Sequence, residues 1–156
     1  MKAVVYTKTG GLEVVKQQSV ETPLPGDDQV LIEVRACALN VSDYQRFQTK
    51  NGRIPFSTSL TNKMMGYIGK PLGAEISGVV VKTGKNVTHV KKGDAVFGKT
   101  VGSAPTGGIA ELALMDKDRV CKKPENFSFE EAATVSISFE TVLGAVRKAD
   151  IKPGQK

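Results

Sequence analysis

Gly73-Ala74-Glu75-Ile76-Ser77-Gly78 leads into the most strand-like segment of the chain. Residues Glu75–Thr83 are rich in β-branched side chains and end at a glycine turn, which predicts a buried strand. In Gln29–Ala38, apolar and polar side chains alternate with a period of two, which indicates a half-buried strand. Its apolar face is expected to hold Val30, Ile32, Val34 and Ala36.

Further short strands, separated by glycine and proline turns, are expected along the chain as far as Lys122. They are Met1–Tyr6, Leu12–Gln17, Val87–Val90, Ala95–Lys99, Ile109–Met115 and Arg119–Lys122. A short helix over Asp43–Thr49, with Ser42 as its N-cap, follows the strand Gln29–Ala38. Lys50–Lys70 is an irregular segment, either a functional lid or a packed insertion. The pattern predicts a mainly β fold with a few helices.

The last thirty or so residues change character and become helical. Ser128-Phe129-Glu130-Glu131 is a capping box that opens a helix through Ala132 and Ala133. A second helix is expected over Phe139–Lys148, with Val142 and Val146 on its apolar face. We therefore divide the chain into a β domain, residues 1–126, and a helical connection, residues 127–156.

Composition narrows the possible partners. The chain has 156 residues, a net charge of +6 and 40% hydrophobic residues. Its lysines are dispersed rather than clustered, so nucleic acid is not expected as a partner. Without a long apolar run or a basic amphipathic helix we expect no membrane contact, and a cytoplasmic location. Cys37 and Cys121 are expected to be free thiols, with Cys37 acting as a small buried hydrophobe.

Five blocks of sequence carry a resemblance to a known family. They are Val34–Asp43, Gly73–Gly78 with Gly84, Gly93-Asp94 before Val96, Gly107–Glu111, and Phe127–Thr141. In order and spacing they resemble the N-terminal domain of the medium-chain dehydrogenase/reductase family. The resemblance implies a GroES-like β-barrel, the catalytic domain of those enzymes, and it covers nearly the whole chain.

The resemblance also bears on metal binding. In the zinc-dependent members, the first block reads Ala-x-Gly-x-Cys-x-Ser-Asp and the second Gly-His-Glu, and both supply zinc ligands. Here those ligand positions are Asn40 and Ala74, and a third falls near Ile137. These residues are unsuited to zinc, and the one histidine, His89, is expected at the surface. The chain is thus similar to the zinc-independent, quinone-oxidoreductase-like branch, which implies NADPH as cofactor and no zinc.

Site residues follow from the same resemblance. Asn40 matches an asparagine that lies beside the nicotinamide and the substrate, where it would act as an amide donor; it could instead cap the helix that follows. Asp43, Tyr44 and Glu75 are further candidate catalytic residues. Asp43 could equally pair with a helix dipole, and Tyr44 could serve packing alone. Thr141 matches a threonine near the cofactor in relatives.

No glycine-rich dinucleotide fingerprint follows a strand and opens a helix in this sequence. Lys152–Lys156 resembles the family's lead-in to its nucleotide-binding Rossmann domain. We therefore expect that this domain is absent from the chain, that the chain is a substrate-side fragment, and that alone it is inactive. Exposed Val142 and Val146 would suit docking to the missing domain.

Three functions remain in view. The leading one is an NADPH-dependent, zinc-independent reductase of quinones, enones or related carbonyls, working by hydride transfer with the chain's own nucleotide-binding domain as partner. An alcohol or aldehyde dehydrogenase on the same fold is the second, and the missing zinc ligands count against it. A free-standing GroES-like binding module without catalysis is the third. Substrate identity, the preference for NADPH over NADH and a homo-oligomeric state stay open.

Overall fold

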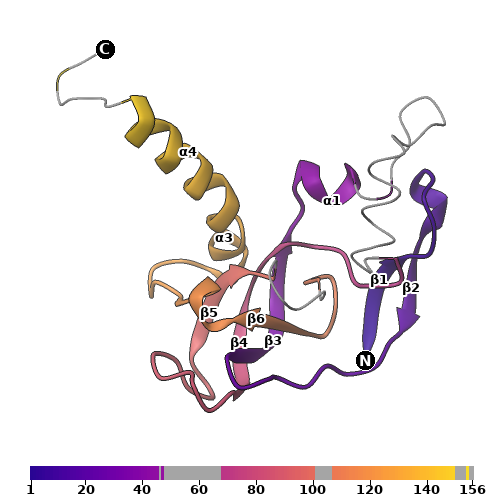
Figure 1. Cartoon of the computed structure of the whole chain (residues 1–156), viewed down its shortest axis with the longest axis horizontal. Coiled ribbons are helices and arrows are strands. Elements are labelled where there is room, and N and C mark those ends of the chain that lie inside the picture. Colours follow the sequence, from indigo (N-terminus) through magenta and orange to yellow (C-terminus); the bar gives the residue numbers. More distant parts are fainter. Residues whose placement is uncertain (46, 48–67, 101–106, 150–153, 155–156) are drawn as a thin grey trace.

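The computed structural model describes residues 1–45, 47, 68–100, 107–149 and 154 (Figure 1). The strands are β1 (Lys2–Tyr6), β2 (Val15–Ser19), β3 (Gln29–Ala38), β4 (Glu75–Thr83), β5 (Ala95–Lys99), β6 (Leu112–Asp116) and β7 (Val120–Lys122). The helices are α1 (Val41–Gln45), α3 (Phe129–Ala133) and α4 (Ser136–Ala149), with 3-10 turns η1 (Leu12–Val14) and η2 (Lys117–Arg119). The mainly β fold expected from the sequence is confirmed.

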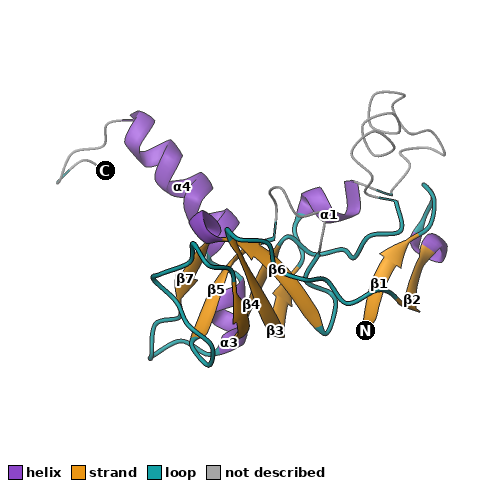
Figure 2. Cartoon of the chain, turned by 60° about the horizontal axis from the view of Figure 1, so that its bottom comes forward, coloured by secondary structure: helices purple, strands orange, loops and turns teal. Residues whose placement is uncertain are grey.

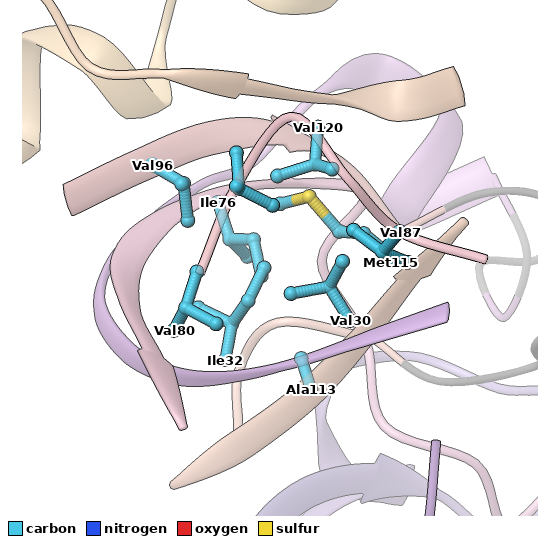
Figure 3. Packing of buried hydrophobic residues seen from close by; sticks show 10 residues of the cluster. Val30, Ile32, Ile76, Val80, Val87, Val96, Ala113, Met115 and Val120 are labelled. Atoms are coloured by element: carbon cyan, nitrogen blue, oxygen red, sulfur yellow. The ribbon is translucent and has the colours of Figure 1, made fainter. Parts of the chain in front are cut away.

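Five antiparallel strands form the main sheet, in the order β6-β3-β4-β5-β7. The sheet curves as a half-barrel around its own apolar core (Figures 2 and 3). That core is built from side chains of all five strands together with Val87 and Val90 from the loop after β4. Its buried members are Val30, Ile32, Ile76, Val80, Val87, Val90, Val96, Ala113, Met115 and Val120. Burial of these branched side chains is the main stabilising contribution to the sheet.

The alternation along β3 changes phase at a bulge. Val34 pairs with Gly78 and Ala36 with Ser77, so Arg35 is an extra residue on β3. Beyond the bulge, Cys37 rather than Ala36 packs against the core, and it pairs with Ile76. The expectation that Ala36 shares the face of Val34 is therefore wrong, because one inserted residue turns the following side chains over.

A second, smaller sheet pairs β1 with β2 and covers a separate apolar cluster. Tyr6, Val14, Phe47 and Leu72 are its buried members. The rings of Tyr6 and Phe47 lie 5.9 Å apart, centroid to centroid. Bridges from Ala3 to Ala110 and from Val5 to Pro71 join β1 to the segments that flank β4 and β6. Through Leu72, this cluster supports the segment that leads into β4.

The two C-terminal helices differ in how they meet the sheet. The capping box is confirmed: Ser128 Oγ accepts from Glu131 N, and the Glu131 carboxylate accepts from Ser128 N. In α3, Ala132 and Ala133 are buried against β3 and β4, and Ser77 Oγ donates to Phe129 O. By contrast α4 projects away from the sheet, and none of its described residues is buried (Figure 1).

Four other expectations from the sequence are corrected. Leu12–Val14 is a 3-10 turn closed by Val14 N donating to Gly11 O, so the strand begins at Val15. Val87–Val90 is not a strand; its two valines anchor a loop in the core. The helix after β3 begins at Val41, before the proposed cap Ser42, which lies inside it. The second C-terminal helix starts at Ser136, ahead of Phe139.

Some expectations lie outside the described residues. The proposed helix beyond Gln45 does so except for Phe47, and so does Lys50–Lys70 except for Ile68, Gly69 and Lys70. His89 is exposed, as expected, and its Nε2 lies 3.2 Å from Val120 O. Among the described residues, no helix combines the length and the apolar character needed to cross a bilayer.

The close approach of β3 and β4 yields a test of the fold. A Cβ at Gly78 would lie 2.1 Å from Glu33 O and 2.8 Å from Ile32 Cγ2. Gly78→Ala should therefore lower the free energy of unfolding by about 1–3 kcal/mol, because a backbone oxygen has to move. Gly144→Ala is the matched control, since a Cβ there meets nothing within 4 Å on an exposed helix. It should raise stability by about 0.5–1 kcal/mol. Urea unfolding followed by circular dichroism measures both, and equal effects would contradict the packing described.

Candidate functional site

Asn40 lies where β3 ends and α1 begins. It is half-buried, and its Nδ2 donates to Glu75 Oε2 at 2.6 Å. Its backbone oxygen accepts from Asp43 N at 2.9 Å, which starts the first turn of α1. Asn40 thus occupies the N-terminal flank of α1, but its side chain reaches across to β4 rather than capping α1.

Glu75 is the first residue of β4, and its side chain is only 1% exposed. One carboxylate oxygen accepts from Asn40 Nδ2, and the other accepts from the backbone N–H of Ile137. Ile137 is the second residue of α4, so this N–H is one that the helix itself leaves without a partner. A carboxylate at a helix N-terminus is also favoured by the helix dipole. Glu75 therefore joins three elements: α1, β4 and α4.

Asp43 holds the backbone around Asn40. It is 2% exposed; its Oδ2 accepts from Asn40 N at 2.8 Å and its Oδ1 from Gly73 N at 3.2 Å. The Asn40 contact has the form of a capping box, in which the third helical residue reaches back to the residue before the helix. The bond to Gly73 ties that turn to the entry of β4. Asn40 is thus fixed twice, at its backbone by Asp43 and at its side chain by Glu75.

The loop before β4 is locked from the other side by Thr100. Its Oγ1 donates to Gly73 O at 2.9 Å, and its backbone N donates to Ala74 O at 2.8 Å. Gly73 has φ +94°, and a Cβ there would lie 2.3 Å from Cys37 Sγ. Glycine is therefore required at this position both by backbone conformation and by the thiol beside it.

Cys37 lies against this network. Burial raises the pKa of its thiol to about 12, and the nearby charges of Asp43 and Glu75 add to the effect. The raised pKa keeps the thiol protonated at neutral pH, and a protonated thiol is a poor nucleophile. No local sequence pattern marks the contacts of Cys37 and Thr100 with Gly73, because both depend on how distant strands pair.

The remaining two candidates lie outside this network. Tyr44 is 45% exposed on α1. Thr141 is exposed on α4, where its Oγ1 donates to Ile137 O at 2.8 Å within the helix. Of the five residues singled out from the sequence, the structure brings Asn40, Asp43 and Glu75 together and leaves Tyr44 and Thr141 apart from them.

The three positions equivalent to zinc ligands do not form a metal centre. Asn40 and Ile137 both bond to Glu75, the first through its side chain and the second through its backbone. Ala74 is buried and has no donor atom in its side chain. Within residues 1–45, 47, 68–100, 107–149 and 154, no three His, Cys, Asp or Glu side chains are grouped so that they could hold a metal ion. The residues present do not fit catalytic zinc, which takes about three protein ligands.

The two cysteines provide a direct test of this packing. At pH 8 the folded chain should present one reactive thiol to a disulfide reagent, the exposed Cys121, because Cys37 stays protonated and largely buried. Both thiols should react after unfolding in guanidinium. Cys121→Ser should leave the folded chain unreactive, whereas Cys37→Ser should leave its fast reaction unchanged. Rapid reaction of the folded Cys121→Ser variant would contradict the burial of Cys37.

Known proteins with similar sequences are oxidoreductases. Quinone oxidoreductase of Sus scrofa is 37% identical over 157 residues, covering 99% of this chain and 44% of that protein. The chloroplastic NADPH-dependent alkenal/one oxidoreductase of Arabidopsis thaliana is 32% identical over 161 residues, covering 99% of this chain and 39% of that protein. The chain therefore spans about two fifths of the length of these relatives.

The fold has solved counterparts as well. The structure of the quinone oxidoreductase from Coxiella burnetii superposes with a TM-score of 0.84 at 30% identity. It covers 99% of this chain and 46% of the matched chain. The sequence model of the Alcohol dehydrogenase GroES-like domain matches residues 26–125, from the loop before β3 to the loop after β7. The chain thus belongs to the Alcohol dehydrogenase GroES-like domain family, among the quinone-oxidoreductase-like members of the medium-chain dehydrogenases/reductases.

Proposed function

We propose that the full-length protein containing this chain is an NADPH-dependent, zinc-independent oxidoreductase that reduces quinones, enones or related carbonyls. The observation that carries the proposal is the fixed amide of Asn40, held by Glu75 at the place where zinc-dependent relatives have a metal ligand. The names of the relatives support a quinone or alkenal acceptor and NADPH. Because the chain spans about two fifths of those relatives, the reaction is proposed for the whole protein.

The chemistry is consistent with a site that lacks a Lewis acid. Quinones and conjugated enones are electron-poor, so they accept hydride without a metal to polarise the carbonyl group. When bound, NADPH supplies the hydride, and the protein supplies orientation and fixed dipoles. In our proposal Asn40 contacts the nicotinamide or the substrate, while Asp43 and Glu75 are positioning residues that hold Asn40 still. Pre-set hydrogen-bonding groups of this kind need little reorganisation during the reaction.

Among the described residues, Asn40 supports a contact with the reacting end of the cofactor only. An amide side chain such as Asn40 complements the nicotinamide carboxamide, which carries both N–H and C=O groups. The pyrophosphate of NADPH would need a glycine-rich turn at a helix N-terminus, and the sequence supplies none after a strand. The proposed partner is therefore the protein's own nucleotide-binding domain, with residues 1–126 as the GroES-like domain and 127–156 as the connection toward it.

The cytoplasmic location and the homo-oligomeric state expected from the sequence also remain proposals. Cell fractionation of the tagged full-length protein tests the first, and light scattering tests the second. A membrane-bound fraction or a strict monomer would contradict them. Neither result bears on the reaction itself.

Mutation of Asn40 tests the proposed reaction. The full-length protein should consume NADPH with quinones or conjugated enones, and a chelator such as EDTA should leave the rate unchanged. Asn40→Ala should lower kcat/KM by about 10²-fold, because an oriented dipole at the reacting groups is lost. Asn86→Ala is the matched control. Asn86 is exposed and donates to Asp28, and it follows the last residue of β4, whereas Glu75 is the first residue of that strand. The kcat/KM of Asn86→Ala should equal that of the wild type.

Other outcomes would overturn the proposal. Oxidation of alcohols that is abolished by EDTA would favour the metal-dependent dehydrogenase reading. No turnover by full-length protein that binds NADPH would favour a binding module without catalysis. An Asn40→Ala variant as active as the wild type would remove Asn40 from the site.

A further inference from the structure

The two ends of the Asn40 amide are held differently. Its Nδ2 donates to Glu75 Oε2 at 2.6 Å. Within the part of the chain that the structure describes, Asn40 Oδ1 has no hydrogen-bond partner. Since the C=O and C–NH₂ arms of an amide diverge from one carbon, the oxygen lies on the side turned away from Glu75.

The chemistry of Glu75 explains this orientation. Two N–H donors converge on its carboxylate, one from Asn40 and one from Ile137, and a charged carboxylate can only accept. A carbonyl oxygen turned toward Glu75 would face a second acceptor and would be repelled. With Glu75 1% exposed, no bulk water could relieve that contact. The orientation of the amide is therefore set by its partner.

We propose that Glu75 makes Asn40 a hydrogen-bond acceptor toward the ligand, instead of the donor expected from the sequence. The inference rests on the proposed function for the identity of the ligand, but its structural part stands on the Glu75 contacts alone. The group that Asn40 Oδ1 meets is an N–H or O–H donor. In the proposed reaction this is either the carboxamide N–H of the nicotinamide or the hydroxyl of the reduced product.

The orientation of the Asn40 amide depends on α4, because α4 supplies the other donor to Glu75, the backbone N–H of Ile137. Ile137 N–H is fixed by the helix and cannot rotate, whereas the Asn40 amide can turn about its last side-chain torsion. If Glu75 loses one acceptor, the helix N–H keeps the remaining oxygen and the Asn40 amide turns over. α4 is also tied to β5 by the Lys99–Glu140 ion pair. The docked helix therefore determines which Glu75 oxygen is left for Asn40.

Two substitutions test whether the ligand needs a hydrogen-bond acceptor or a donor at position 40. In Glu75→Gln, the amide oxygen serves Ile137 N–H and the new NH₂ group faces Asn40, so Asn40 turns its oxygen inward and its N–H outward. We expect kcat to fall about tenfold or more, since the ligand now meets a donor. Adding Asn40→Asp returns an acceptor to both sides of position 40, so kcat should rise severalfold above that of Glu75→Gln. Glu33→Gln, at an exposed carboxylate on β3, is the control and should change nothing.

The opposite order of kcat values for the single and the double variant would overturn the proposal. If the ligand requires a donor, Glu75→Gln keeps its activity and the double variant loses it. Unfolding in urea separates this result from loss of fold. The new NH₂ group donates to the turned Asn40 oxygen in Glu75→Gln and to a carboxylate in the double variant, so the double variant should be at least as stable as Glu75→Gln. A double variant much less stable than Glu75→Gln would contradict the assigned contacts.

A cofactor analogue distinguishes the two possible donors, the nicotinamide N–H and the product hydroxyl. The reduced 3-acetylpyridine analogue of NADPH has no carboxamide N–H. If Asn40 Oδ1 meets the nicotinamide, the wild type should prefer NADPH over the analogue, and Asn40→Ala should lose that preference. If it meets the product hydroxyl, Asn40→Ala should slow both cofactors equally. A preference that survives Asn40→Ala, together with full activity, would contradict both.

The orientation of the Asn40 amide can also be tested without measuring enzyme activity. In ¹⁵N spectra of the full 156-residue chain, the Asn40 side-chain NH₂ should exchange slowly in the wild type and rapidly in Glu75→Gln. If the full-length protein reduces no quinone or enone, the proposed function fails while this measurement still decides the orientation. Rapid exchange in the wild type would overturn the inference whatever the activity.

Discussion

A buried carboxylate has to find N–H donors, and Glu75 finds them on two elements that the sequence places far apart. Its side chain is 1% exposed and accepts from Asn40 and Ile137. An unpaired charge at this depth would destabilise the fold by several kcal/mol, roughly. The position of α1, the start of β4 and the direction of α4 all depend on satisfying it. Asp43 and Thr100 extend the same rule, because each holds backbone groups of the loop before β4.

This arrangement gives α4 an unusual dependence on polar contacts. The helix buries no residue in the described chain, and Phe139, Val142 and Val146 stay 43% to 59% exposed. Its connection to the sheet is made by the Glu75 contact at its N-terminus and the Lys99–Glu140 ion pair one turn on. An exposed ion pair contributes little by itself. The N-terminal contact is therefore the one that fixes where α4 leaves the domain, and it is shared with the candidate site.

Much of the fold could be predicted from local sequence patterns. The alternation in β3 and the β-branched run in β4 follow from side-chain direction in strands, and the Ser128 capping box is a local hydrogen-bond pattern. The bulge at Arg35 could not be predicted in this way, because it arises from pairing with β4. For the same reason Cys37 rather than Ala36 faces the core. Val87–Val90 was expected to be a strand because valines buried in a loop give the same apolar pattern in the sequence as valines in a strand.

The candidate site was predictable to a similar extent. Family resemblance singled out Asn40, Asp43 and Glu75, which the structure brings together, but also Tyr44 and Thr141, which it does not. The partner that completes the network is a backbone N–H at Ile137, 62 residues from Glu75, and no side-chain pattern marks it. Resemblance likewise suggested that Asn40 donates to a ligand, whereas in the structure its amide NH₂ group is turned toward Glu75, to which it donates.

The bond between Glu75 and the N-terminus of α4 can be measured through amide hydrogen exchange of Ile137. An N–H in the first turn of a helix normally exchanges close to the rate of an unprotected peptide. Bonded to a buried carboxylate, the Ile137 amide should exchange on the order of 100-fold more slowly than its unprotected rate. Exchange at the unprotected rate would mean that Glu75 does not hold α4 and that the hydrogen-bond network around Asn40 is not formed as described.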